Sequence, residues 1–187
     1  PTMRPPLLNH IALLCRSVEE TAAKLAVQKF PIGPTEVFDG EGTKEIYVGD
    51  MDGEKALLLL MEPTRPGSYQ NALEKRGPGL HHLGLNVDSL DEFERSVKGS
   101  GFEILSQTVG KRTRWFKANG FPALLEVSEW DGFRERARSF VGKVELPAEC
   151  AALLAALRCE GLSPGGKEVK LQLPNEFSFA VKDFLQP

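Results

Sequence analysis

Two histidines occupy matching positions in an internal repeat of this chain. Residues 9–20, NHIALLCRSVEE, align without a gap on residues 81–92, HHLGLNVDSLDE, so that His10 falls on His82. The chain contains only three histidines, so a match between two of them is informative. Internal similarity of this kind indicates two related structural modules. Imidazole can hold a metal ion or transfer a proton near neutral pH, and both histidines are therefore candidate site residues.

The ends of the two modules also match, at a spacing of 67 residues. Leu59 falls on Glu126, and Glu62 falls on Glu129. Side chains alternate between the two faces of a strand, so Glu62 should lie on the opposite face from Leu59 and cannot take its place. Of the repeat-matched positions, three therefore hold groups that can bind a metal, and the fourth holds a leucine.

His10, His82 and Glu126 carry groups that can bind a divalent metal ion. Two imidazoles with one carboxylate form the donor set that holds non-haem Fe(II), and His/Glu sites accept several metals, so Fe, Mn, Co, Ni and Zn are all candidates. A single histidine in an apolar strand is more often a hydrogen-bonded core residue, but the matched pair and the carboxylate favour a metal. A buried Glu126 without metal or partner would be costly. The alternative is a fold that has lost its metal, for which Leu59 is the best argument.

Each module is predicted to have the element order β-α-β-β-β. Ser17 with Glu20, and Ser89 with Glu92, form capping-box patterns that start helices, and Asp-Gly and Asn-Gly dipeptides mark hairpin turns. The first module, residues 7–62, is predicted to have its elements near 7–15, 18–29, 35–38, 44–48 and 55–61. The second module, residues 80–130, is predicted to have them near 80–87, 90–99, 103–107, 112–118 and 123–128. A linker with a short helix over 69–75 joins the two modules.

Residues 131–187 do not repeat the histidine pattern. Their apolar periodicity predicts strands over 143–146, 168–173 and 177–184 and a helix over 148–159. We expect a βαββ-like C-terminal extension that covers an edge or forms the contact of a homodimer. The predicted fold class is therefore α+β, with two paired βαβββ modules over 7–130 followed by this extension.

Composition excludes several classes of protein. The net charge is −3, so nothing indicates binding to nucleic acid or to an anionic membrane surface. The sequence has no apolar run of the roughly 20 residues that span a bilayer and no signal-peptide core at its start. Three cysteines at unrelated spacings do not form a disulfide framework. We expect a cytoplasmic globular protein that acts on a small molecule.

The runs LLMEP and LEKRGPGLHHLGLNVDSLDEF resemble the linker and second-module start of methylmalonyl-CoA epimerase. Over residues 7–130 the chain is similar to the vicinal oxygen chelate superfamily, which includes glyoxalases, bleomycin-resistance proteins and extradiol dioxygenases. The resemblance implies that the two modules form one cleft, with a divalent metal at the positions of His10, Leu59, His82 and Glu126. The epimerase and glyoxalase pattern has Glu or Gln where this chain has Leu59. The resemblance also implies that Glu45, in EGTKEIYVG, abstracts an α-proton.

The leading functional hypothesis is metal-dependent enolate chemistry by a lyase or epimerase. Its substrate would be a small carbonyl compound or acyl thioester, and Glu45 or Glu126 would move the proton. An Fe(II) extradiol-type dioxygenase is the first alternative, although His81 is expected to face away from His82 and so cannot shuttle protons. A metal-free small-molecule binding protein is the second alternative. Arg112, the repeat partner of Glu45, and Arg114 could hold a substrate carboxylate, although solvated strand charges are the commoner role.

Overall fold

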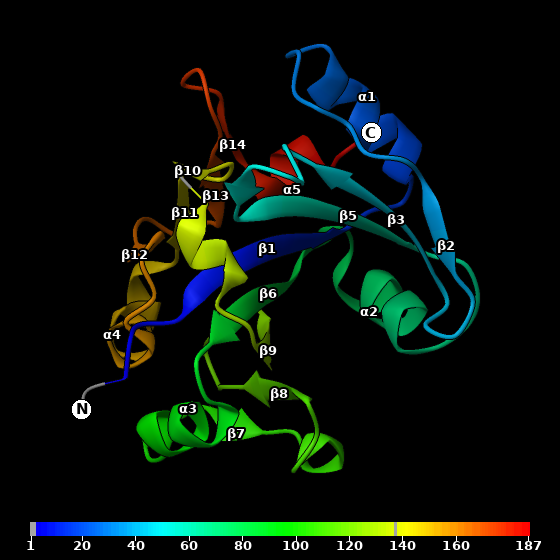
Figure 1. The fold of residues 1–187 in the computed structure, drawn as a ribbon. Coiled ribbons are helices and arrows are strands. Elements are labelled where there is room, and N and C mark those ends of the chain that lie inside the picture. The colour runs from blue at the N-terminus through cyan, green and yellow to red at the C-terminus, as the bar shows by residue number, and fades with distance from the viewer. Residues whose placement is uncertain (1–2, 137) are drawn as a thin grey trace.

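The computed structural model describes residues 3–136 and 138–187 and is built around one open, curved sheet of eight strands (Figure 1). The strand order is β2-β3-β5-β1-β6-β9-β8-β7, with the modules side by side and β1 antiparallel to β6 at the centre. Module one contains β1 (Leu7–Leu14), α1 (Val18–Ala26), β2 (Glu36–Phe38), β3 (Thr43–Val48), β4 (Glu54–Lys55) and β5 (Leu57–Pro63). Module two contains β6 (Gly79–Val87), α3 (Leu90–Val97), β7 (Glu103–Ile104), η1 (Ser106–Thr108), β8 (Thr113–Lys117) and β9 (Leu124–Glu129). The predicted α+β class and paired βαβββ modules are confirmed.

The first helix of each module begins at its predicted cap. The Ser17 hydroxyl accepts a hydrogen bond of 3.2 Å from the Glu20 backbone N–H, and Ser89 accepts one of the same length from Glu92. Such caps satisfy backbone donors that have no partner within the helix. Helix α1 ends at Ala26, three residues before the predicted end, and α3 ends at Val97.

The glutamate at the end of each module's last strand reinforces the same helix start. The Glu62 carboxylate accepts a hydrogen bond of 2.9 Å from the Val18 N–H, and the Glu129 carboxylate accepts one of 2.9 Å from the Leu90 N–H. A carboxylate is favourable there because the helix N-terminus carries partial positive charge. The alignment of Glu62 with Glu129 is therefore a real structural equivalence.

The C-terminal residues fold over one face of the large sheet. They contain η2 (Gly132–Glu135), β10 (Arg138–Ser139), β11 (Lys143–Leu146), η3 (Ala148–Cys150), α4 (Ala151–Leu157), β12 (Leu162–Pro164), β13 (Lys170–Gln172), β14 (Ser178–Ala180) and α5 (Val181–Phe184). Strand β10 pairs with β4, and the others form a four-stranded sheet in the order β12-β11-β13-β14. The sequence analysis missed the short strand β12, and the segment 177–184, expected to be one strand, is β14 followed by α5.

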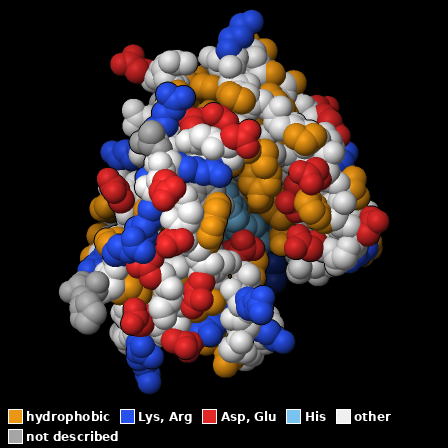
Figure 2. All heavy atoms as spheres, in the orientation of Figure 1, with side chains coloured by type: hydrophobic (Ala, Val, Ile, Leu, Met, Phe, Trp, Pro, Cys, Tyr) orange, Lys and Arg blue, Asp and Glu red, His pale blue; other side chains and the backbone are white. Residues whose placement is uncertain are grey.

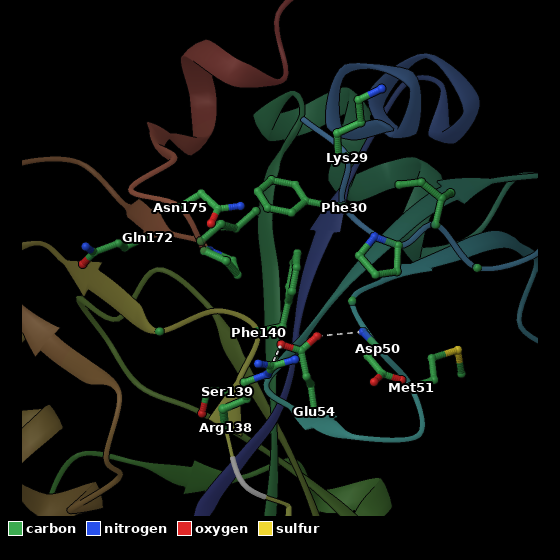
Figure 3. Close-up of a pocket in the computed structure, with 17 residues that line it drawn as sticks. Lys29, Phe30, Asp50, Met51, Glu54, Arg138, Ser139, Phe140, Gln172 and Asn175 are labelled. Atoms are coloured by element: carbon green, nitrogen blue, oxygen red, sulfur yellow. Dashed lines mark hydrogen bonds and ion pairs between the residues drawn. The ribbon is translucent and has the colours of Figure 1, made fainter. Parts of the chain in front are cut away.

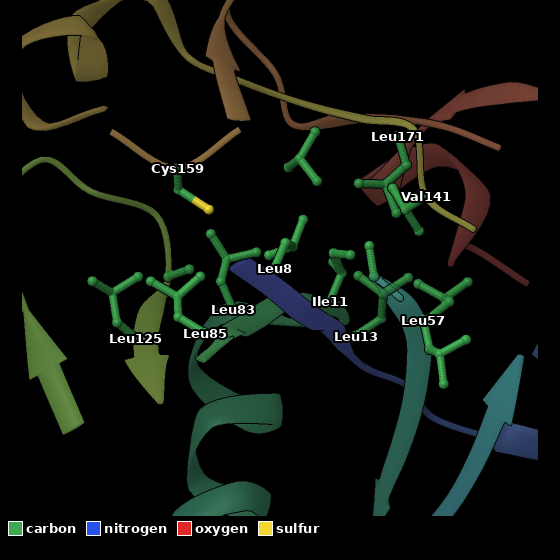
Figure 4. Close-up of a cluster of buried hydrophobic side chains, with 14 of the residues drawn as sticks. Leu8, Ile11, Leu13, Leu57, Leu83, Leu85, Leu125, Val141, Cys159 and Leu171 are labelled. Atoms are coloured by element: carbon green, nitrogen blue, oxygen red, sulfur yellow. The ribbon is translucent and has the colours of Figure 1, made fainter. Parts of the chain in front are cut away.

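The main core lies between this extension and the large sheet. Leucines of β1 and β6, among them Leu13, Leu83 and Leu85, form one layer of this core, and the extension contributes Val141 and Leu171 to the layer that packs on it (Figure 4). All five side chains are at most 1% exposed. The extension thus covers the face of the sheet that carries α1 and α3, which leaves the opposite face for a site. Among the residues the structure describes, no helix is long and apolar enough to cross a bilayer.

The opposite face is partly roofed by the linker helix α2 (Ser68–Arg76). Its Leu73 packs with Ala12, Leu14, Leu59 and Met61 in a second, smaller apolar cluster. This cluster lies on module one, so only part of the face remains open.

Candidate metal centre

His10, His82 and Glu126 converge on the uncovered face of the sheet. The Nε2 atoms of His10 and His82 lie 3.1 Å apart, and His10 Nε2 lies 3.6 Å from Glu126 Oε1. One ligand atom from each residue lies within 4.8 Å of the other two. Ligands bound about 2.0 to 2.2 Å from an ion are separated by roughly 2.9 to 3.6 Å at octahedral or tetrahedral angles. Two of the separations match this range, so the three side chains form a possible site for a divalent metal ion.

Both histidines follow a β-bulge in the central strand pair. The pairing of β1 with β6 shifts register between Leu8 and His10, and again where β6 passes His81. A bulge places two consecutive residues opposite one partner and interrupts the alternation of side chains. Asn9 and His81, the extra residues, therefore sit beside His10 and His82 instead of facing away. The prediction that His81 faces away from His82 is wrong, because it assumed unbroken alternation.

The two bulge residues contact the inner nitrogens of the histidines. His10 Nδ1 lies 2.9 Å from Asn9 Oδ1, and His81 Nδ1 lies 2.8 Å from His82 Nδ1. The Asn9 amide N–H donates to Asn86 Oδ1 at 2.6 Å, which fixes Asn9 Oδ1 as an acceptor. An acceptor at this position favours the His10 tautomer that carries its proton on Nδ1 and has a lone pair on Nε2. Partners of this kind orient metal-binding imidazoles.

A glycine makes room for the His10 ring. Gly84 is the register partner of His10 across the sheet, and a Cβ there would lie 2.1 Å from the ring carbon Cε1. The repeat alignment places Ala12 on Gly84, and Ala12 is the register partner of His82. Each histidine thus lies opposite a small residue of the other module's first strand.

Burial holds the three imidazoles in the neutral form. It lowers the pKa of His10 to about 4, and burial with the Arg76 charge lowers the pKa of His81 to about 4. Burial and the neighbouring histidines lower the pKa of His82 well below its ordinary value. Burial, with the charges of nearby glutamates, raises the pKa of Glu126 to about 7. The site therefore keeps its nitrogen lone pairs available at neutral pH.

Glu45 lies on the same side of the sheet as these residues. It is buried, accepts a hydrogen bond of 2.6 Å from the Thr43 hydroxyl, and has a pKa raised mainly by burial. Its charge raises the pKa of both Glu126 and Tyr47. It does not line the small cavity of about 160 Å³ over the site. That cavity is lined by Asn9, His10, Tyr47, Gly84, Leu85, Asn86, Glu126 and Ser128.

Leu59 occupies the position that the sequence alignment assigned to it. It pairs with Ala12 of β1 and Tyr47 of β3, and it is buried in the cluster beneath α2. Its neighbours Leu58 and Leu60 point into the main core on the other face. The fourth equivalent position is thus an apolar wall on the site's side of the sheet.

The proposed alignment of Glu45 with Arg112 is wrong by one residue. Trp115 pairs with Glu126 just as Tyr47 pairs with Leu59, and by the same count Thr113 is the counterpart of Glu45. Thr113 hydrogen-bonds Ser128 at 3.2 Å.

Neither arginine that was considered for a substrate carboxylate is part of the candidate site. The Arg114 side chain binds Asp91 at 2.8 Å and Glu94 at 3.2 Å on α3, which lies on the other face. Arg112 is exposed and lies outside β8.

Sequence reasoning missed Trp115, which packs beside the metal-competent histidines. Its ring centroid lies 4.9 Å from that of His82. Trp115 is the counterpart of Tyr47 in the other module, and this pair of aromatic residues could have identified it. The sequence alignment missed the pair because it was wrong by one residue in this strand. Histidine side chains lie at the bottom of a hollow in the surface, flanked by hydrophobic and acidic groups (Figure 2).

Solved structures similar to this chain include methylmalonyl-CoA epimerases and a hypothetical protein. The epimerase from Mycobacterium tuberculosis has 22% identity and a TM-score of 0.52, covering 66% of this chain and 87% of its own. An epimerase solved with methylmalonyl-CoA and NH4+ has 25% identity and a TM-score of 0.52, covering 67% and 96%. A hypothetical protein from Bacillus halodurans has 20% identity and a TM-score of 0.56, covering 68% and 96%. No protein-family model and no curated protein matches the sequence. The chain has the vicinal oxygen chelate fold, as its resemblance implied.

Proposed function

We propose that this protein is an enzyme of the vicinal oxygen chelate fold that performs metal-dependent enolate chemistry on an acyl thioester or small carbonyl compound. The observation that carries the proposal is the convergence of two Nε2 atoms and one carboxylate on the open face. The structural likeness to epimerases that bind methylmalonyl-CoA supports an acyl-CoA substrate. His10, His82 and Glu126 would hold the metal, which when bound polarises a carbonyl oxygen.

The residues of this chain would supply positioning and proton transfer. Glu45 would take the proton from the carbon next to the carbonyl, since burial raises its pKa and makes it a stronger base than an exposed carboxylate. Glu126, with a pKa of about 7, is the second carboxyl group that could move a proton. Helix α2, which covers Leu59 and Met61 beside the site, would limit water around the substrate.

The test is exchange of the α-proton of methylmalonyl-CoA in deuterium oxide, with the metal content of the purified protein measured beside it. Glu45→Gln should lower the exchange rate by about 100-fold or more, the usual scale for losing a general base, with unchanged metal content. Glu103→Gln, an exposed position on the outermost strand β7, is the matched control. Equal exchange by Glu45→Gln and wild type would remove Glu45 from the mechanism.

An Fe(II) extradiol-type dioxygenase is the second candidate, and His81 favours it. Two histidines and one carboxylate suit iron, and the bulge brings a third imidazole to within 2.8 Å of His82. Oxygen uptake with a catechol, after loading with Fe(II), distinguishes this activity from proton exchange. A protein that binds no divalent metal would instead be the metal-free binding protein that Leu59 allows.

A further inference from the structure

A second cavity, the Phe121 cavity, lies where module two meets the C-terminal extension. Its volume is about 450 Å³, within the range of about 300 to 1,000 Å³ for small-molecule sites. Its apolar lining comes from β6, the β8–β9 hairpin and the extension, with the side chains Leu80, Phe121, Pro122, Leu124, Val169 and Val181. It contains none of the residues that converge at the metal centre. An apolar body of small-molecule size fits this cavity.

Four cationic side chains also line this cavity. Arg76, Lys117, Lys167 and Lys182 face a single acidic liner, Glu168. In the part of the chain that the structure describes, none of the four forms an ion pair, although Lys182 donates a hydrogen bond of 3.0 Å to the Arg76 carbonyl. The protein as a whole has a net charge of −3, so this local excess of positive charge is a distinct feature.

A larger cavity differs from the Phe121 cavity in that its buried charge is already paired. It has a volume of about 950 Å³ and lies between module one and the extension (Figure 3). Its buried acid, Glu54, already accepts a hydrogen bond of 2.9 Å from the Asp50 N–H and pairs with Arg138 at 3.3 Å. The protein itself thus satisfies the buried charge there, whereas the four cations of the Phe121 cavity form no ion pair among the residues that the structure describes.

We propose that the Phe121 cavity binds a phosphate ester with an apolar body. A phosphate carries about −1.5 to −2 charges at pH 7 and three strong acceptor oxygens, which complements four cations better than a carboxylate does. Arg76 can bind it through two hydrogen bonds, with the lysines as point charges. The apolar body then lies on Leu80, Phe121 and their neighbours. This site goes beyond the proposed function, because it uses none of the metal-binding residues.

The test is calorimetric titration of the full-length protein with n-octyl phosphate, below its micellar concentration. Octanol, inorganic phosphate and octanoate are the comparison ligands. Octyl phosphate should bind at least tenfold more tightly than any of the three. Equal affinity for octanol would overturn the role of the cations, and equal affinity for inorganic phosphate would overturn the role of the apolar lining. Octanoate binding as tightly would overturn the preference for a phosphate.

Variants locate the binding in this cavity. Lys117→Gln with Lys167→Gln removes two exposed side chains that make no ion pair in the described chain, and it should weaken octyl phosphate binding by about tenfold. Lys98→Gln with Lys111→Gln changes the net charge equally, away from the cavity, and should leave the affinity unchanged. Equal loss in both double variants would overturn the site. Binding should persist in His10→Ala, so a failed metal centre and a failed phosphate site give different results.

Discussion

The two modules have the same framework but opposite linings. In both, a serine caps the first helix, and a glutamate from the last strand accepts a hydrogen bond from the N-terminus of that helix. Both also have a β-bulge beside the histidine and a small residue opposite the other module's histidine. On the site's side, module one presents the apolar side chains of Ala12, Leu14, Leu59 and Met61. Module two presents the polar groups of Asn86, Thr113, Glu126 and Ser128.

The shared features are those on which backbone geometry depends. Caps and bulges satisfy or redirect backbone groups, so their loss would disturb the helix start or strand register. The side chains that line the site do not hold the backbone in place. One module can therefore have an apolar lining while the other keeps polar, metal-binding side chains. The difference leaves the site's side of module one largely apolar and covered by α2, while module two supplies polar groups to the small cavity over the site.

The largest effect should come from Gly84→Ala. The added Cβ would lie 2.1 to 2.6 Å from three atoms of the His10 ring, so the ring must leave its place. We expect a loss of about 3 kcal/mol in unfolding free energy and of metal binding, measured by denaturant titration and calorimetry. Gly142→Ala, whose Cβ would meet no atom closer than 3.8 Å, is the control. A Gly84→Ala protein as stable as this control would contradict the placement of His10.

The next prediction concerns pH and Glu126→Gln in metal-free protein. Folding raises the pKa of Glu126 from 4.5 to about 7, so the folded state binds the proton more tightly. The contribution of the Glu126 carboxyl to the unfolding free energy is complete below pH 4.5. It is lost as the pH rises through 7, because the folded protein must then hold a buried negative charge. Glu126→Gln should therefore nearly match wild type at pH 4.5 and exceed its unfolding free energy by about 3 kcal/mol at pH 8. Unfolding titrations at both pH values check this, and a constant difference would refute it.

Leu59→Glu should make module one resemble module two. A carboxylate at this position faces the site's side of the sheet, opposite Ala12 and Tyr47. Lost outer-shell support typically costs 10- to 100-fold in metal affinity, so a gained ligand should tighten binding by at least tenfold. Calorimetric titration with Mn²⁺, Co²⁺ and Zn²⁺ measures the change, with Leu59→Gln beside it. If a folded Leu59→Glu protein binds metal no more tightly, Leu59 does not belong to the metal centre.

The smallest effects should be similar in the two modules, although Glu62 also pairs with Lys44 at 3.6 Å. Glu62→Gln and Glu129→Gln each remove a charge from a helix N-terminus while keeping a hydrogen-bond acceptor. We expect each to cost about 0.5 to 1 kcal/mol of unfolding free energy, measured by thermal or denaturant unfolding. A large difference between the two variants would show that the modules do not share this support.

Much of the framework could be read from residue types and spacing. The matched histidines, the Ser17 and Ser89 caps and the alternation around Leu59 all depend on local periodicity, which a strand or helix imposes on its own residues. These features predicted the modules, and the resemblance to the vicinal oxygen chelate superfamily implied that the three side chains converge. The short strand β12 and helix α5 escaped prediction because segments of three or four residues carry too little periodicity.

Tertiary structure decided the rest. Asn9 and His81 reach the histidines because β1 and β6, 72 positions apart in the repeat, pair with one extra residue on each strand. Cross-strand pairing likewise set Thr113, and not Arg112, opposite the end of β9. The extension packs on a face of the sheet, and not on an edge, because only there does it bury leucines of both modules at once. Register and packing are fixed by contacts between distant segments, and no local pattern contains them.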